Sequence, residues 1–276
     1  MKSVMENKFV TDIVLTFLSE TICPLIALNT SICAGGTRNM GGPLLDAFAK
    51  ALLDPEYFCA YTIVMCNAEN FQIYHAENYV NKLLETKPAI FQDNIFLNEL
   101  YKSIDDLTIK DRKKLKVVHI SDPHIDFMYA PGSDAFCKDY LCCRAKQGFP
   151  EEKERQAGPW GSYQCDLPPA TLELMFKYIA EEVKPDILIW TGDNSPHVIW
   201  ENDHEEVVSA TTNITNMILK AFKNTNITVI AAHGNHDTFP ANNHDFSHKN
   251  SLVVLDDYGK LWEEAGWLEA NESIEF

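Results

Sequence analysis

The chain has 276 residues, which is enough for one large domain or for two unequal domains. Hydrophobic residues make up 46% of it and charged residues 23%, a balance that is ordinary for a globular protein with a sizeable core. The net charge of −17 argues against binding to the nucleic-acid backbone and against electrostatic attraction to anionic lipid, since both need clustered Lys and Arg.

The N-terminal region is predicted to be helical. Apolar residues recur at helical spacing over Phe9–Leu18 and again over Leu44–Leu52, although such a stripe is as often plain core packing. Two Gly-Gly pairs within residues 35–42 predict a turn between these helices, and Pro43 suits the start of the second one. A third helix is expected over Tyr57–Met65. No segment of the chain has the roughly 18 uncharged apolar residues of a transmembrane helix.

Residues 69–112 are mixed and polar, and we interpret them as a linker with a helical segment. From Leu115 onward, short apolar segments of strand type alternate with helical ones, in the order 116–121, 169–183, 186–191, 205–222 and 227–232. Strands separated by helices predict βαβ units and a parallel sheet. Ligands of such sheets bind beyond the carboxyl ends of the strands, so the residues after each strand form the candidate site.

A polar cluster follows each predicted strand, namely Asp122-Pro-His124, Gly192-Asp193-Asn194 and Gly234-Asn235-His236-Asp237. Right-handed crossovers would bring all three clusters to one edge of the sheet. Their carboxylate, imidazole and amide groups are suitable ligands for Zn²⁺ or a similar divalent ion. A shared carboxylate such as Asp193 could bridge two metal ions about 3.5–4 Å apart, an arrangement used for phosphoester hydrolysis. Each cluster alone could be an ordinary turn, but their order at three strand ends favours a metal site.

These clusters resemble the first three signatures of the calcineurin-like metallophosphoesterases, D-x-H, G-D and G-N-H-[DE]. The resemblance implies that Asp122 and His124 serve one metal ion, that Asp193 bridges, and that Asn235 serves the other ion. His236 is similar to the family's catalytic histidine, a general acid for the leaving oxygen. The family's two remaining signatures, Gly-His and Gly-His-x-His, would follow the last residue, so we expect truncation there and little turnover.

Four cysteines lie between the first two clusters, at positions 137, 142, 143 and 165. Spacing alone allows three pairings among them, and a zinc site is disfavoured because no C-x₂-C pair is present. The segment Cys137-Lys-Asp-Tyr-Leu-Cys142-Cys143-Arg resembles the acid sphingomyelinase family, and that resemblance implies the disulfides Cys137–Cys142 and Cys143–Cys165. The family also has a histidine near the substrate phosphate. His197 matches it and is our second acid candidate, the alternative being a solvated loop histidine.

The four N-terminal cysteines resemble the last four of a saposin-type module with six cysteines. This resemblance implies a Cys23–Cys33 disulfide, and partners for Cys59 and Cys66 in a C-x-x-C motif that would lie before Met1. We therefore expect Cys59 and Cys66 to be unpaired, or paired in a way that the family does not use. We also expect truncation at the N-terminus, where the first ten residues lack the apolar segment of a signal peptide.

The predicted fold class is α+β with two domains. Residues 1–68 would form a partial, all-α saposin B-type domain, and residues 69–112 a linker. Residues 113–276 would form an α/β metallophosphoesterase sandwich that lacks its C-terminal part.

The resemblance implies a sphingomyelin phosphodiesterase-like hydrolase that uses two divalent ions, foremost Zn²⁺, to release ceramide and phosphocholine. Its saposin-like helices would contact a membrane surface. We expect no nucleic-acid binding and make no prediction of oligomeric state. Two alternatives stay open: a hydrolase of nucleotides or other phosphoesters with the same site, and an inactive lipid-binding fragment or pseudoenzyme.

Eight cysteines and four N-glycosylation sequons indicate an oxidising, secretory compartment. A secreted or lysosomal location is therefore expected. The sequons begin at Asn29, Asn213, Asn226 and Asn271.

Overall fold

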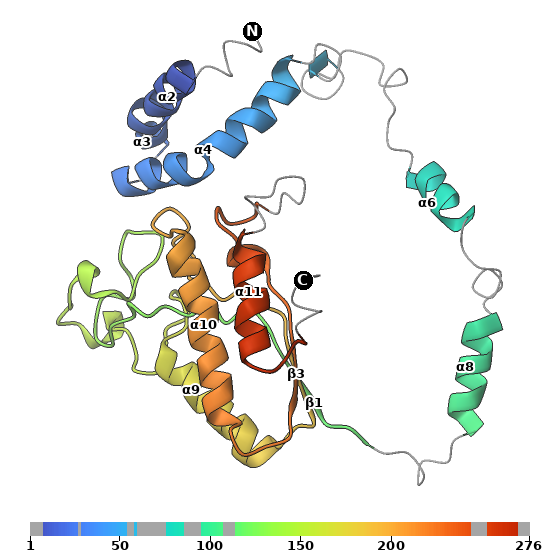
Figure 1. Ribbon diagram of the computed structural model, residues 1–276. Helices are drawn as coiled ribbons and strands as arrows, with labels where there is room; N and C mark the ends of the chain where they lie inside the picture. Colours follow the sequence, from blue (N-terminus) through green and yellow to red (C-terminus); the bar gives the residue numbers. More distant parts are fainter. Residues whose placement is uncertain are drawn as a thin grey trace. The chain divides into compact units, whose positions relative to one another are not determined.

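The computed structural model (Figure 1) describes residues 8–26, 29–53, 58–59, 76–85, 95–106, 114–243 and 253–269. Contacts divide the chain into two units, which are considered separately. The smaller unit comprises Met1–Val10 and Pro43–Lys114, and the larger unit comprises Thr11–Gly42 and Leu115–Phe276. Among the described helices, none combines the length and the apolar character that a membrane span needs.

The smaller unit contains the second half of helix α4 (Thr30–Leu53), helix α6 (Ala76–Glu85) and helix α8 (Ile95–Asp106). Of the third predicted helix, the structure describes Phe58 and Cys59. Cys59 is disulfide-bonded, which rules out the first of the two expected alternatives, an unpaired Cys59, and leaves the second, a pairing that the family does not use. Cys66 lies outside the described residues.

The larger unit is built on three short strands, β1 (Val117–Ile120), β2 (Ile187–Trp190) and β3 (Thr228–Ala231). They form one sheet in the order β1-β2-β3, and both pairings are parallel, as the alternation of apolar segments predicts. β-branched and other large apolar residues dominate all three strands, in keeping with their packing in a half-buried sheet. Because the strands are parallel, their carboxyl ends meet at one edge of the sheet.

Helices α9 (Pro169–Tyr178), α10 (His204–Ala221) and α11 (Val253–Glu264) form the helical layer, and α10 packs against both of the others (Figure 1). A π-helical turn, Ile179–Val183, extends α9 toward β2. Pro169 occupies the first turn of α9, where a backbone N–H has no helical partner to lose. The helical segment predicted at 169–183 is thus present, with its last five residues as a π-helical turn, and the helix predicted at 205–222 is shifted by one residue at each end.

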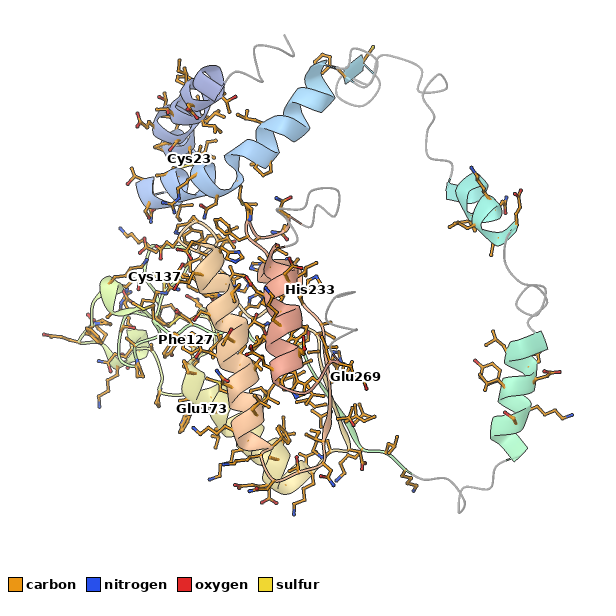
Figure 2. The ribbon with its side chains drawn as sticks, viewed as in Figure 1. Cys23, Phe127, Cys137, Glu173, His233 and Glu269 are labelled. Atoms are coloured by element: carbon orange, nitrogen blue, oxygen red, sulfur yellow. A yellow bond between two sulfur atoms is a disulfide. The ribbon has the colours of Figure 1, made fainter. Side chains whose placement is uncertain are left out.

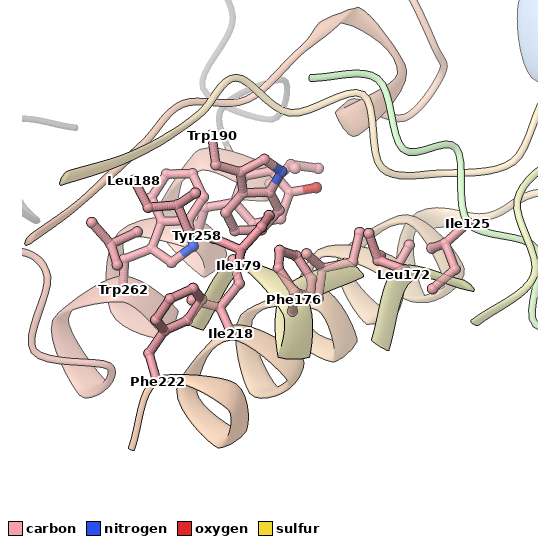
Figure 3. Close-up of a cluster of buried hydrophobic side chains, with 14 of the residues drawn as sticks. Ile125, Leu172, Phe176, Ile179, Leu188, Trp190, Ile218, Phe222, Tyr258 and Trp262 are labelled. Atoms are coloured by element: carbon pink, nitrogen blue, oxygen red, sulfur yellow. The ribbon is translucent and has the colours of Figure 1, made fainter. Parts of the chain in front are cut away.

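The hydrophobic core lies between the sheet and these helices (Figure 3). Leu188 and Trp190 of β2 are fully buried, and the Trp190 ring meets the Trp262 ring edge to face at 5.9 Å between centroids. Successive side chains of a strand point to opposite faces of a sheet. On the face away from this core, Val117 and Ile230 are 49% and 51% exposed. The buried core residues from the three helices are Leu172, Phe176, Ala210, Ile214, Ile218, Val254, Leu255, Tyr258 and Trp262.

N-terminal helices also belong to the larger unit. They comprise most of α2 (Lys8–Phe17), a π-helical turn over Leu18–Ile22, the short α3 (Cys23–Leu25) and the first half of α4. A disulfide joins Cys23 to Cys33, the pair that the resemblance implies.

The turn predicted over residues 35–42 is wrong, because α4 continues through both Gly-Gly pairs with Pro43 inside it. The glycines allow close packing instead. A Cβ atom on Gly35 would lie 1.9 Å from the carbonyl oxygen of Trp200, and one on Gly41 would lie 2.5 Å from a methyl carbon of Leu15. A glycine costs a helix roughly 1 kcal/mol relative to alanine, a cost that such packing can offset.

The first half of α4 holds the segment that follows His197. The buried Asn39 side chain donates through Nδ2 to the carbonyl oxygens of Ile199 (2.8 Å) and Asn202 (3.0 Å). Ile32 packs beside Trp200 in the same region. The N-terminal helices therefore support a loop next to one of the predicted polar clusters.

The two faces of the sheet predict different costs of truncation. Leu188→Ala removes a fully buried side chain and should lower the free energy of unfolding by about 2–5 kcal/mol. Ile230→Ala, on the opposite face, should lower it by less than about 1 kcal/mol. Urea denaturation of both variants measures the difference. Equal losses would contradict this, because they would show that both faces are packed alike.

Candidate active site

Backbone hydrogen bonds join the loops that follow β1 and β2. The N–H of Asp122 donates to the carbonyl oxygen of Gly192, and the N–H of His124 donates to that of Asp193, both at 3.0 Å. Asp122, His124 and Asp193 have φ angles of 53°, 35° and 59°, in the left-handed region that residues other than glycine rarely adopt. Such strain costs on the order of 1–3 kcal/mol per residue and is concentrated at functional sites.

The buried carboxylate of Asp237 links the loop after β2 to the loop after β3. It accepts the backbone N–H groups of Asp193 (2.7 Å), Asn194 (2.8 Å) and Gly234 (2.8 Å). Burial raises the pKa of Asp237, and these three N–H groups oppose that shift. The Tyr258 hydroxyl donates to the Asp237 carbonyl oxygen, which ties α11 to the same loop.

Two glycines permit this close approach. Gly192 has a φ of 78°, and a Cβ atom there would lie 2.3 Å from the backbone nitrogen of Gly234. A Cβ atom on Gly234 would in turn lie 2.3 Å from Oδ1 of Asp193. Neither position can hold a side chain unless the backbone shifts, which explains why the second and third clusters begin with glycine.

Three of the four predicted metal ligands come together. Asp122, His124 and Asp193 each offer a ligand atom, and these atoms lie within 4.8 Å of one another. His124 donates from Nδ1 to the Ser195 carbonyl oxygen at 2.8 Å, which leaves Nε2 as its ligand atom. The Ser121 hydroxyl donates to the Asp122 carboxylate. Two carboxylates, together with an imidazole that carries its hydrogen on Nδ1 and leaves Nε2 free, are suitable ligands for a divalent ion such as Zn²⁺.

Asn235, the fourth predicted ligand, is exposed and begins the turn Asn235–Asp237. Its Nδ2 donates to Oδ1 of Asn242 at 2.7 Å, which fixes the orientation of the amide. The next residue, His236, donates its backbone N–H to Oδ1 of Asp193 at 2.7 Å. Asn235 is thus the first residue of the turn whose backbone is bound by the Asp193 carboxylate.

Three histidine rings gather at the site. The centroid of the His124 ring is 3.9 Å from that of His197 and 4.8 Å from that of His236, and His197 and His236 are 5.1 Å apart. The predicted catalytic histidines therefore both lie beside a predicted metal ligand. Within the described part of the chain, the buried Nδ1 of His236 has no hydrogen-bond partner.

The two candidate acids have opposite pKa shifts. A hydrogen bond to Asp166 raises the pKa of His197, and nearby carboxylates add to this effect. Burial lowers the pKa of His236, and the positive charges of His124 and His197 lower it further. The histidine proton is therefore more stable on His197 than on His236.

Sequence reasoning missed Asp166, which lines a cleft of about 570 Å³ together with Asp122, His124 and His197. Asp166 is almost fully buried, and it directly follows Cys165. Its position in that predicted disulfide segment was the available signal, but a carboxylate alone does not indicate a partner.

The disulfide-bonded segment between the first two clusters is fastened to the site. It carries the disulfides Cys137–Cys142 and Cys143–Cys165, and much of it is loop, as the surroundings of Phe127 and Cys137 show (Figure 2). The buried Arg144 guanidinium donates to both carboxylate oxygens of Asp126, at 2.8 and 3.1 Å. It also donates to Glu201 at 3.0 Å. This ion-pair network, which sequence reasoning also missed, connects the loops after β1 and β2.

A family model of calcineurin-like phosphoesterases matches residues 115–275. Sphingomyelin phosphodiesterase B of Dictyostelium discoideum is 43% identical over 162 residues, which are 58% of this chain and 25% of that protein. Sphingomyelin phosphodiesterase A of the same organism is 31% identical over 258 residues, 87% of this chain and 40% of that protein. Sphingomyelin phosphodiesterase of Homo sapiens is 32% identical over 160 residues, 56% of this chain and 25% of that protein. The chain thus spans 25–40% of the length of these relatives.

The ligand cluster predicts divalent-metal binding that depends on Asp193. In isothermal titration with Zn²⁺, Asp193→Ala should weaken binding by at least about 10–100-fold, since even groups that only support metal ligands have effects of this size. Glu182→Gln serves as the control, because Glu182 is an exposed carboxylate in the π-helical turn before β2, at the opposite edge of the sheet. Equal affinity of the Asp193 variant and the control would contradict the prediction.

Proposed function

The chain belongs to the calcineurin-like phosphoesterase family, and on that basis we propose that it hydrolyses a sphingomyelin-like phospholipid to ceramide and phosphocholine. The observation that carries the proposal is the cluster of Asp122, His124 and Asp193 at one sheet edge. The similarity to sphingomyelin phosphodiesterases supports the choice of substrate. The strained backbone at all three residues also supports a functional cluster rather than three ordinary turns.

We propose that Asp122, His124, Asp193 and Asn235 hold two divalent ions, with Zn²⁺ as the expected metal. Such ions activate the attacking water and neutralise the charge that develops on the phosphate oxygens. The protein's own contribution is to hold Asp193 in place through Asp237, and Nε2 of His124 in place through Ser195. Preorganised groups of this kind need no rearrangement during the reaction.

His197 and His236 are the proposed catalytic histidines. His197 lines the cleft beside Asp122 and His124, and its side chain is 44% exposed, so a substrate can reach it. With Nδ1 bound by Asp166, Nε2 of His197 is the nitrogen that can give a proton to the leaving ceramide oxygen. The His236 ring is 4.8 Å from that of His124 between centroids, and its backbone N–H donates to Asp193, a position from which it would contact a bound phosphate.

The N-terminal helices are proposed to be a partial saposin B-type domain over residues 1–68, joined by a linker over residues 69–112 to a catalytic domain over residues 113–276. Their role would be to engage a lipid surface. Two observations support this: the Cys23–Cys33 disulfide and a series of exposed apolar side chains. The latter are Ile13, Phe17, Leu18, Ile22, Leu25 and Ile26.

We also propose a secreted or lysosomal location, which the disulfides of the larger unit support. Among the candidate glycosylation sites, Asn226 is exposed between α10 and β3. Asn29 and Asn213 use their amide nitrogens within the protein, on Asp139 and Ser209 respectively. Asn271 lies outside the described residues.

The proposed function predicts zinc-dependent release of phosphocholine from sphingomyelin in mixed micelles by the 276-residue chain. Because the sequence predicts a low turnover, the protein is used in excess over substrate and product is followed for hours. Asp193→Ala should reduce the release at least about 100-fold, since Asp193 would hold both metal ions. Glu182→Gln should keep the wild-type rate.

Two results would contradict this function. Cleavage of a nucleotide diester but not of sphingomyelin would favour a different substrate class for the same site. Zinc binding and vesicle binding without cleavage of either substrate would favour a lipid-binding protein without activity.

A further inference from the structure

Asp166 binds His197 at two points. Oδ2 accepts the backbone N–H of His197 and Oδ1 accepts the ring Nδ1–H, each at 2.7 Å. Asp166 is 8% exposed, whereas the His197 side chain is 44% exposed. One contact fixes the backbone and the other fixes the ring, so the pair determines both the position and the rotation of the imidazole.

Asp166 is itself held by both of its chain neighbours. Cys165 before it is joined to Cys143 by a disulfide. Leu167 after it donates its N–H to the carbonyl oxygen of His124 at 3.1 Å, and its own carbonyl oxygen accepts the N–H of Asp126 at 2.9 Å. These contacts fix the Asp166 carboxylate relative to the loop after β1, which carries the proposed metal ligands Asp122 and His124.

The hydrogen bond also determines the tautomer of His197. A carboxylate oxygen only accepts, so Nδ1 must carry the hydrogen, and Nε2 is the nitrogen left for the cleft. Ser195 does the same for His124 through its carbonyl oxygen. Two adjacent imidazoles, 3.9 Å apart, thus have the same tautomer but different partners.

We propose that Asp166 is a positioning residue, which holds His197 with Nδ1 protonated and Nε2 facing the cleft. The disulfide Cys143–Cys165 and the Leu167 backbone fix Asp166 relative to the loop after β1. The disulfide-bonded segment would in this way serve the reaction, through its link to His197. This inference rests on the proposed function for its catalytic consequence, but the arrangement itself can be measured without activity.

The tautomer is tested by long-range ¹H–¹⁵N NMR on the metal-free 276-residue chain labelled at histidine nitrogens, at a pH where the rings are neutral. His197→Gln identifies the signal of His197. The wild type should show the Nδ1–H tautomer, and Asp166→Ala should shift His197 toward the Nε2–H form that free imidazole side chains favour. Asp139→Ala, an exposed carboxylate in the same segment, should leave the signal unchanged. An Nε2–H tautomer in the wild type, or no change in Asp166→Ala, would overturn the proposal.

The catalytic consequence is tested with two leaving groups. Asp166→Ala should slow phosphocholine release from sphingomyelin by about 10²-fold, the lower end of general-acid effects. Release from 4-nitrophenyl phosphocholine should fall by less than about threefold, since its leaving group needs little protonation. Equal losses on both substrates would assign Asp166 a merely structural role and overturn the proposal.

Asp166→Asn provides a second variant in case alanine disturbs folding, because it keeps the shape of the side chain and loses its charge. It should show a mixture of the two tautomers and an intermediate rate on sphingomyelin. A wild-type tautomer together with a wild-type rate in this variant would also overturn the proposal. If neither substrate is cleaved but the tautomer changes as expected, the proposed function fails while the position of His197 stands.

Discussion

The carboxylate of Asp237 is the constraint on which the site depends. A buried carboxylate is costly unless hydrogen bonds satisfy it, and here three backbone N–H groups from two loops do so. That demand brings the loops so close that Gly192 and Gly234 have no room for a Cβ atom. With the loops fixed in this way, Oδ1 of Asp193 can accept the N–H of His236, so a proposed metal ligand and a proposed catalytic residue are positioned by the same contact.

A second set of contacts places the remaining loops relative to this centre. Arg144 and Asp166 both belong to the disulfide-bonded segment between the first two clusters, and each spans two loops of the site. Arg144 bridges Asp126 and Glu201, which lie in the loops after β1 and β2. Asp166 holds His197, while Asn39 of α4 supports the residues that follow it. The residues after the strands thus supply the proposed ligands, and polar contacts between residues far apart in the sequence hold the surrounding loops in position.

Much of this could be predicted from the sequence, because the signals are local. Apolar segments between helical ones predict the parallel sheet, and a polar cluster after each segment predicts the edge where Asp122, His124 and Asp193 meet. The partnership of Asp166 with His197 joins residues 31 positions apart and leaves no periodic signal. The error in α4 has the same origin. Gly35 looks like a turn residue locally, but what it accommodates is the carbonyl oxygen of Trp200, far along the chain.

The difference between the two catalytic candidates follows from where one carboxylate lies. His197 and His236 are 5.1 Å apart and share the neighbour His124, so a proton on one ring disfavours a proton on the other. Asp166 breaks this symmetry, because it binds His197 directly while the Nδ1 atom of His236 is buried. Burial and the charge of its neighbours then lower the pKa of His236, and the hydrogen bond raises that of His197. When the environments of two neighbouring groups separate their pKa values in this way, the group with the higher pKa carries the proton and the other stays neutral. Here His197 is the group suited to act as the acid, and His236 is the neutral one.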